Sequence, residues 1–384
     1  MDRWKRFVDW CQQPSKVKIR TFNPRNIMII ALSVLIISLI TSGSWLYQVF
    51  SVTQTPDLNR ENYESLFSTL IITEDTVLNE DHQGSIIIEA DGVTLDGNGH
   101  TITGPGVWVW NSTERMWWPT SCGITVIGRS GVTVKNCHVT NFAFGLTLSN
   151  SDGCTLLNNT IYDNVYVGIS VVFSVNNTIL ENTVHSTRNV GESYDYTGLA
   201  VGNLEEPYDY TGFGVDMSFG NTFKGNVAYD NGWGFSIGEF EIEIFEEEMG
   251  FIPEEYEDNI FEGNTAEGNT KAGFWIGGLH NPPPFSNIFF HNNLIENAIQ
   301  ASVPPTEYGY SNTWDDGYPS GGNYWSDYTG VDADGDGIGD TPYEIPTVSY
   351  EWDEEDPNAD PIPIIGEPDG NNVDRFPLMA PFSG

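Results

Sequence analysis

The chain has 384 residues, with 54 Asp and Glu against 15 Lys and Arg, and a formal net charge of −39. Such an acidic surface repels phosphate backbones, which argues against nucleic-acid binding, whereas it favours metal cations. A charged fraction of only 18% with 13% aromatic residues argues against disorder, and 40 glycines with 21 prolines are typical of turn-rich β structure.

The first 50 residues predict an export or membrane segment. A basic cytoplasmic region, residues 1–26, precedes an apolar run without charges that begins at Ile27. A membrane-spanning helix needs about 20 apolar residues, and Trp45 and Tyr47 stand where interfacial aromatic residues are expected. Residues 27–50 are therefore expected to form a transmembrane anchor, with a cleaved signal peptide as the alternative. In both cases the remaining chain is extracytoplasmic, either as a single-pass membrane protein or as a secreted one.

Residues 71–310 contain an internal repeat of 22 or 23 residues. One mark of the repeat is a glycine followed by alternating apolar residues, as in Gly145-Leu-Thr-Leu and Gly168-Ile-Ser-Val. The second mark is an asparagine 14 residues after that glycine, and Cys137 fills this position once. In the other coils the position is occupied by Asn98, Asn159, Asn182, Asn226, Asn264 and Asn292.

This period predicts a stack of short strands. Two alternating strands separated by turns fit 22 residues, and no helical pattern of comparable length follows residue 70. Leucine-rich repeats share the period, but their leucine signature is absent. The sequence therefore predicts an all-β parallel β-helix of about eight or nine coils, whose recurring asparagines stack as an amide ladder at a turn.

Two regions carry a resemblance to NosD-type right-handed parallel β-helix proteins. The first coil, Gly84-Ser-Ile-Ile-Ile-Glu-Ala-Asp-Gly-Val-Thr-Leu-Asp-Gly-Asn-Gly-His-Thr-Ile, and the asparagine coils resemble the body of that fold. The tail resembles its end in exported archaeal surface proteins, through Gly322-Asn-Tyr-Trp-Ser-Asp-Tyr-Thr-Gly, Asp332-Ala-Asp-Gly-Asp-Gly-Ile-Gly-Asp-Thr-Pro-Tyr and Asn372-Val-Asp-Arg-Phe-Pro-Leu. The family takes its name from copper delivery to a periplasmic reductase, although this sequence has no His-rich or Met-rich cluster.

Repeat and resemblance together imply a right-handed, single-stranded parallel β-helix. The expected β-helix spans residues 71–310, after a linker and N-terminal cap at 51–70 and before a C-terminal coil and tail at 311–384. Insertions are expected near residues 105–120, 187–211 and 239–258.

The tail contains a predicted calcium loop. Its carboxylates stand at positions 1, 3, 5 and 9 of the loop, with a glycine at position 6 for the sharp turn. Carboxylates this close repel one another unless they share an ion. An EF-hand glutamate is missing, because Tyr343 stands at position 12, and a solvated Asp-Gly turn is the alternative. The predicted Ca²⁺ ligands are Asp332, Asp334, Asp336, the carbonyl of Ile338, and Asp340.

Two of the insertions predict a ligand groove. The step from the asparagine position to the next repeat glycine is normally 8 or 9 residues, but it is 25 from Asn98 to Gly123 and 30 from Asn182 to Gly212. Both excess segments have the same phase, so they should project from one corner, about 14 Å apart. Aromatic walls with a few polar groups suit a sugar chain, although the aromatics could instead cover the barrel. The candidate ligand-binding residues are Trp108, Trp110, Trp117, Trp118, Tyr162, Asp163, Tyr166, Tyr194, Asp195, Tyr196, Tyr208, Asp209 and Tyr210.

No catalytic residue is predicted, because basic residues are isolated, histidines fall at unrelated places and no paired-carboxylate signature is present. Cys122, Cys137 and Cys154 start from different corners, so no intrachain disulfide is expected. We expect an extracytoplasmic surface protein that binds a glycan or forms part of the cell envelope. A carbohydrate-active lyase or hydrolase and a copper-handling protein remain as alternatives, and the oligomeric state is left open.

Overall fold

The computed structural model describes residues 68–104, 108–111, 116–119, 122–164, 167–187, 211–216, 218–238, 258–277, 287–305, 312–351 and 362–384. These residues form strands, turns and irregular segments without a helix. None of them therefore belongs to a helix that could cross a membrane, and the apolar segment 27–50 lies outside the described ranges.

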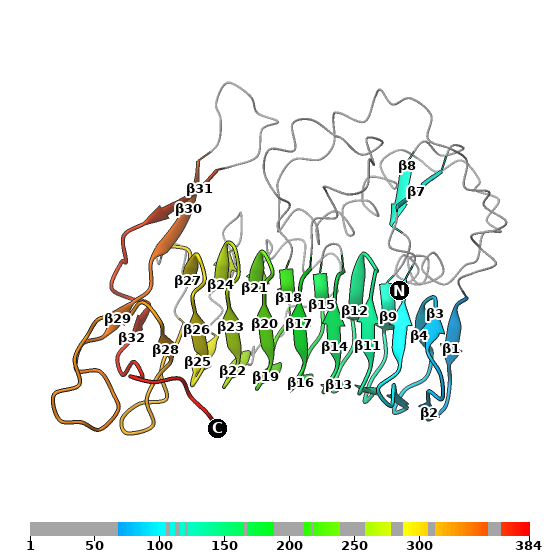
Figure 1. Cartoon of the computed structure of the whole chain (residues 1–384), viewed down its shortest axis with the longest axis horizontal. Helices are drawn as coiled ribbons and strands as arrows, with labels where there is room; N and C mark the ends of the chain where they lie inside the picture. The colour runs from blue at the N-terminus through cyan, green and yellow to red at the C-terminus, as the bar shows by residue number, and fades with distance from the viewer. Residues whose placement is uncertain are drawn as a thin grey trace, which may run out of the picture.

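The described chain is a parallel β-helix whose coils stack along the long axis of the molecule (Figure 1). Each complete coil contributes one strand to each of three sheets, here called A, B and C, with nine, eight and nine strands. Sheet A contains β1 (Leu70–Ile72), β4 (Ile86–Ile88), β9 (Cys122–Ile127), β12 (Phe144–Ser149), β15 (Val167–Val172), β18 (Thr211–Asp216), β21 (Trp233–Gly238), β24 (Ala272–Gly277) and β27 (Ile299–Ser302). The expected number of coils is thereby confirmed.

The other two sheets use shorter strands. Sheet B contains β2 (Thr76–Val77), β5 (Thr94–Asp96), β10 (Thr133–Lys135), β13 (Thr155–Leu157), β16 (Thr178–Leu180), β19 (Thr222–Lys224), β22 (Ile260–Glu262) and β25 (Ile288–Phe290). Sheet C contains β3 (His82–Gln83), β6 (Thr101–Thr103), β11 (His138–Thr140), β14 (Thr160–Tyr162), β17 (Thr183–His185), β20 (Val227–Tyr229), β23 (Thr265–Glu267), β26 (Asn293–Ile295) and β28 (Tyr324–Trp325).

The expectation of two strands per coil was wrong, because there are three. The strands of sheets B and C are short, and β13 and β14 are separated only by Asn158 and Asn159. Asn158 adopts a φ of 52°, a left-handed conformation that asparagine tolerates and that bends the chain within one residue. In the sequence, such a pair of strands looks like one alternating run. The period itself is confirmed, since Thr133 pairs with Thr155 and Thr155 with Thr178.

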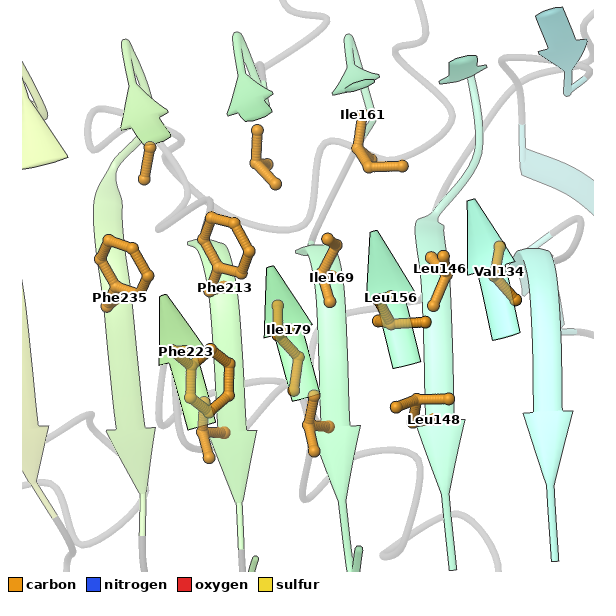
Figure 2. Packing of buried hydrophobic residues seen from close by; sticks show 14 of the residues in the cluster. Val134, Leu146, Leu148, Leu156, Ile161, Ile169, Ile179, Phe213, Phe223 and Phe235 are labelled. Carbon is orange, nitrogen blue, oxygen red and sulfur yellow. The ribbon is translucent and has the colours of Figure 1, made fainter. Parts of the chain in front are cut away.

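The core is a stack of identical inward positions. Leu146 and Leu148 in β12 are followed by Ile169 in β15 and by Phe213 in β18, all fully buried (Figure 2). From Phe213 to Phe274 the column is aromatic, and the rings of Phe213 and Phe235 stack with centroids 4.7 Å apart. Like side chains thus pack on like side chains, which explains why the apolar pattern repeats coil by coil.

The repeat glycine stands where the coil turns from sheet C into sheet A. At Gly168, a Cβ atom would lie 2.1 Å from Val184 Cγ1 and 2.9 Å from the carbonyl oxygen of Gly212 in the next coil. The position therefore excludes every side chain, because interiors of this density have no room to move aside.

The recurring asparagines form a buried hydrogen-bonded ladder at the turn between sheets B and C. Asn182 Oδ1 accepts the backbone N–H of Asn159 at 3.0 Å and its Nδ2 at 2.9 Å, and Asn182 Nδ2 donates to Leu156 O at 2.9 Å. Cys137 begins this ladder, since its backbone N–H donates to Asn159. Asn98 was wrongly included, because it is exposed with a φ of 50° and stands outside the buried row.

Two further asparagine ladders were not expected. One follows the turn between sheets A and B, and the other follows the turn between sheets C and A, each linking the backbone of one coil to an amide of the next. The A–B ladder contains Asn177, Asn221, Asn259, Asn287, Asn312 and Asn372. The C–A turns contain Asn164, Asn231, Asn269 and Asn297 in this role.

The tail closes the C-terminal end of the β-helix. Trp314 stacks on Phe289 of the last complete coil, and Trp325 stacks on Tyr343 with ring centroids 4.2 Å apart. The tail contains two antiparallel pairs, β29 (Tyr343–Glu344) with β32 (Val373–Asp374), and β30 (Thr347–Glu351) with β31 (Ile362–Gly366) (Figure 1). The second pair lies at the two ends of residues 347–366, an acidic and proline-rich stretch of the sequence.

Candidate functional site

Two long connections leave the β-helix at one corner. The connection from β6 to β9 and the connection from β17 to β18 both join a strand of sheet C to a strand of sheet A. The two intervening connections, from β11 to β12 and from β14 to β15, are short turns. Three strand spacings separate β9 from β18, which is about 14 Å. The strand order thus agrees with the prediction that both long segments leave the β-helix at the same corner.

The first connection contains an antiparallel hairpin of β7 (Trp108–Asn111) and β8 (Met116–Pro119). In its register Trp110 is opposite Trp117, and Val109 is opposite Trp118. The hairpin therefore gathers the four candidate tryptophan positions within two short strands. The candidate residues Tyr166, Tyr194, Asp195, Tyr196, Tyr208, Asp209 and Tyr210 lie outside the described residues.

Tyr162 stands beside this corner, at the end of β14. Its ring stacks on His185 with centroids 5.6 Å apart, and His185 stacks on Tyr229 with centroids 4.6 Å apart. His185 therefore has aromatic rings on both faces, whereas Tyr162 has one face turned away from the column. Asp163 follows in an exposed turn with a φ of 51°. Tyr162 and Asp163 thus lie at the C–A corner, on a coil between the two long connections.

The sequence did not identify His185 and Tyr229 as partners of Tyr162. The available signal was the coil register, since these three residues occupy the same position of consecutive sheet C strands. Residues of different type at one register position are easily overlooked when a repeat is recognised by identical letters.

The tail brings together three of the predicted metal ligands. One carboxylate oxygen each of Asp332, Asp334 and Asp336, here called the acidic triad, lie within 4.8 Å of one another. Asp340 is turned elsewhere, because its Oδ2 accepts the backbone N–H of Ala333 at 2.8 Å. The triad is therefore compact, and Asp340 does not belong to it in this arrangement.

The electrostatics of the triad are uneven. The backbone N–H of Gly337 donates to Asp332 Oδ2 at 2.9 Å, and this bond lowers the pKa of Asp332. The charge of Asp336 raises the pKa of Asp334. A hard divalent cation would balance the negative charges of the triad, because carboxylate oxygens are its preferred ligands.

Residues 332–340, here called the acidic loop, are hydrogen-bonded to the end of the chain. The backbone N–H of Gly339 donates to Pro377 O at 2.8 Å, and that of Met379 donates to Gly337 O at 3.0 Å. Leu378 in turn donates to Asn323 O at 2.9 Å, next to the end of the B–C ladder. Residues 332–340 are therefore hydrogen-bonded to the chain end that caps the β-helix.

The described residues do not form a donor set suited to copper. Copper sites use imidazole, thiolate and thioether ligands. Among the residues that the structure describes, the acidic triad is the group of potential ligands close enough to share one ion, and it offers only hard oxygens. His185 is held between two tyrosines, and His291 stacks on Phe382 with centroids 4.2 Å apart.

The three described cysteines are free thiols, as expected. Cys122 belongs to sheet A, whereas Cys137 and Cys154 stand at the B–C and A–B turns. Burial raises the pKa of Cys137 to about 12 and also raises that of Cys154, so both remain protonated. Protonated thiols are poor metal ligands and poor nucleophiles.

A family model described as "Periplasmic copper-binding protein (NosD)" matches residues 58–246 and 241–330. No curated protein matches the chain. Among solved structures, a mannuronan C-5 epimerase A-module from Azotobacter vinelandii is similar with 13% identity and a TM-score of 0.34, covering 66% of this chain and 79% of that one. A pectate lyase has 15% identity and a TM-score of 0.33, covering 70% and 72%. A full-length tailspike protein from an Escherichia coli O157:H7 bacteriophage has 11% identity and a TM-score of 0.35, covering 75% and 47%.

Proposed function

The chain belongs to the family of periplasmic copper-binding proteins (NosD), and within that family we propose that it is an extracytoplasmic surface protein that binds a glycan. The family description agrees with export, which the apolar segment 27–50 also predicts. In this proposal the segment anchors the β-helix to the cell membrane, or is cleaved to release it.

The observation that carries the proposal is the position of the two long connections. Both leave at the C–A corner with two short turns between them, so they can form the two sides of a groove about 14 Å wide. The first connection carries four tryptophans, and the second carries the repeated segment Tyr-Asp-Tyr-Thr-Gly. Tyr162 and Asp163 lie on the coil between them. Aromatic surfaces with a few carboxylates match the apolar faces and hydroxyls of sugars.

Glycan binding can be tested with the full chain in detergent, on an array of neutral and anionic oligosaccharides. The double substitution Trp110→Ala and Trp117→Ala should weaken binding of any positive glycan at least tenfold. Ile364→Ala is the matched control, since Ile364 is an exposed apolar residue on β31 in the tail, and it should leave binding unchanged. Equal binding by both variants would remove the corner groove from the proposal.

The same assay separates binding from catalysis. Mass spectrometry of the recovered oligosaccharide should show the intact ligand if the protein only binds it. Shortened or unsaturated products would instead support the alternative of a hydrolase or a lyase.

Copper handling is retained as a second candidate, because the family description names copper. The donor chemistry of the described residues disagrees with it. Titration of the full chain with Cu²⁺ in excess Ca²⁺ decides between them. A stoichiometric copper site that persists under those conditions would favour the family's described role over glycan binding.

A further inference from the structure

Two sequons for asparagine-linked glycosylation stand at turns that border sheet B. Asn158-Asn159-Thr160 spans the turn between β13 and β14, and Asn176-Asn177-Thr178 spans the turn before β16. A third sequon begins at Asn111 and continues outside the described residues. Patterns of three residues also occur by chance, so the surroundings of each asparagine decide whether it can carry a sugar.

The first asparagine of each sequon faces solvent. Asn158 and Asn176 are exposed, whereas Asn159 and Asn177 are 1% exposed and belong to the buried ladders. Asn158 Nδ2 donates to Asn136 Oδ1 at 2.8 Å. An amide nitrogen that carries a sugar keeps one N–H, so this hydrogen bond is compatible with the modification.

The fold itself does not require asparagine at these two positions. In neighbouring coils, Gly153 takes the place of Asn176 at the A–B turn, and Glu181 and Gly225 take the place of Asn158 at the B–C turn. All five residues have a φ between 52° and 63°. The left-handed turn therefore accepts several residue types, and its conformation does not explain why asparagine stands two residues before a threonine in these two coils.

Asn176 borders a shallow furrow along the A–B corner. The furrow has a volume of about 620 Å³ and is lined by the A–B turns of four consecutive coils. A Cβ atom at Gly92 or Gly153 would meet nothing within 4 Å, so the turns leave open space there. The exposed Asp91 and Asp152 supply acceptors for sugar hydroxyls. The first sugars of a chain on Asn176 therefore have room in the furrow.

The two coils with sequons are apolar where the neighbouring coils are charged. Sheet B directs the third residue of each of its full strands outward, and this residue is Leu157 in β13 and Leu180 in β16, both half-buried. The same position holds Lys135 in the preceding coil and Lys224 in the following one, each paired with a carboxylate. Sugars attached at the two edges of the sheet would shield the leucines from solvent, since sugar rings have apolar faces.

We propose that Asn158 and Asn176 are attachment sites for N-linked oligosaccharides. The donor is an oligosaccharide joined through phosphate to a polyisoprenoid lipid, and a separate transferase of the cell is the catalyst. Asparagine Nδ2 forms a bond to C1 of the first sugar. The C1–O bond to the phosphate breaks, its electron pair stays with the lipid phosphate, and the amide proton passes to a base of the transferase. The proposal rests on the extracytoplasmic location in the proposed function, and it is independent of glycan binding.

The test uses the full chain, isolated in detergent from the cells that produce it naturally, and tandem mass spectrometry of its peptides. The peptides with Asn158 and Asn176 should carry the mass of an oligosaccharide. Asn136 is an internal comparison, because it occupies the same turn as Asn158 one coil earlier but is followed by His138 at the place of the sequon threonine. It should be unmodified.

The substitutions Thr160→Val and Thr178→Val should each abolish the oligosaccharide on the asparagine two residues earlier, without altering that asparagine. The matched control is Thr155→Val, since Thr155 pairs with Thr178 in the sheet and follows the turn residue Gly153 instead of an asparagine. It should leave both oligosaccharides in place. Each variant exchanges one β-branched residue for another, so the melting temperatures should stay close to that of the wild type.

Protease digestion of spheroplasts shows on which side of the membrane the chain lies. A chain that is digested there, or recovered from the medium, with unmodified Asn158 and Asn176 would overturn the proposal and leave the proposed function standing. A protected, unmodified chain would overturn both. Sugar retained on Asn158 in the Thr160→Val variant would show that the sequon does not direct the modification, which also overturns the proposal. Failure to bind any glycan of the array, with both oligosaccharides present, would overturn glycan binding alone.

Discussion

A single buried asparagine links three coils of this molecule. The side chain of Asn226 accepts the backbone N–H of Asn182 at 2.9 Å, and its Nδ2 donates to Ile179 O at 2.7 Å and to Asn264 Oδ1 at 2.9 Å. Each rung therefore satisfies backbone groups that the turn between two sheets leaves unpaired. Because all rungs point the same way, the amides polarise one another, which strengthens the row as a whole.

Removal of one rung should be costly. Asn226→Ala leaves the backbone N–H of Asn182 buried and unpaired, and a buried unsatisfied group costs about 1–3 kcal/mol. With the loss of the other two bonds, we expect a decrease of about 3 kcal/mol in the free energy of unfolding, measured by urea denaturation. Asn79→Ala, at an exposed asparagine, should change it by less than about 0.5 kcal/mol. Equal effects of the two substitutions would contradict the role of the ladder.

The B–C ladder ends on a carboxylate. Asp374 accepts the backbone N–H of Asn323 at 2.7 Å and the Nε1–H of Trp325 at 2.8 Å, and it is fully buried. An acceptor-only group is suited to the last rung, because no further carbonyl is present to receive an amide N–H₂. Burial outweighs these donors and raises the pKa of Asp374 from 3.8 to about 6.

This shift predicts a pH dependence of stability. A carboxyl whose pKa is raised in the folded state favours folding when protonated, so its contribution is present below about pH 4 and lost as the pH rises through about 6. A shift of about two units corresponds to about 3 kcal/mol. The difference between the free energies of unfolding of wild type and Asp374→Asn, measured by urea denaturation, should therefore change by about that amount between pH 4 and 7. Parallel pH profiles would show that Asp374 titrates normally in the fold.

At the scale of the strand, the repeat glycine and its neighbours have different roles. In β18, a Cβ at Gly212 would lie 2.7 Å from Gly234 O and 3.0 Å from Asn231 Nδ2, whereas a Cβ at Gly214 would meet nothing closer than 3.3 Å. Gly212→Ala should therefore destabilise the protein by about 2 kcal/mol through overpacking, and Gly214→Ala by less than about 1 kcal/mol. The two variants share one strand, so their urea midpoints can be compared directly. A larger effect of Gly214→Ala would contradict the packing argument.

The sequence predicted the length of the coil and the position of its turns, but it missed two of the asparagine ladders and a column of stacked rings. The B–C ladder was visible because asparagine occupies nearly every coil. The A–B ladder begins with Cys154, and at the C–A turn Phe142 precedes Asn164 and Thr187 precedes Asn231, so other residue types interrupt the letter pattern. The common corner of the two long connections followed from the period alone. The column of Tyr162, His185 and Tyr229 was missed, because it depends on which side chains share a register position in consecutive strands.

The whole molecule combines a stacked barrel with a strong negative charge. Seven of its 15 basic residues precede residue 26, so the excess of carboxylates is concentrated in the remaining chain. Self-repulsion of like charges destabilises a compact state. At the C-terminal end the acidic loop, the last asparagine rung and Asp374 belong to one hydrogen-bonded cap. A cation bound there would relieve repulsion at the place where the stack is closed.

We therefore expect Ca²⁺ to stabilise the full chain. A ligand that binds only the folded state at 100 times its Kd adds about 2.7 kcal/mol, which for a protein of this size is a rise of about 3–4 °C in Tm. Calorimetric scans in EGTA and at increasing free Ca²⁺ measure this rise. The variant Asp334→Asn, Asp336→Asn should lose most of it, because the acidic triad keeps a single carboxylate. Mg²⁺ at equal ionic strength controls for general screening of the net charge, since its stricter geometry fits such a loop poorly. If EGTA and excess Ca²⁺ give the same Tm, or if Mg²⁺ and the double variant reproduce the effect of Ca²⁺, the loop is a solvated turn and the cap is held by its hydrogen bonds alone.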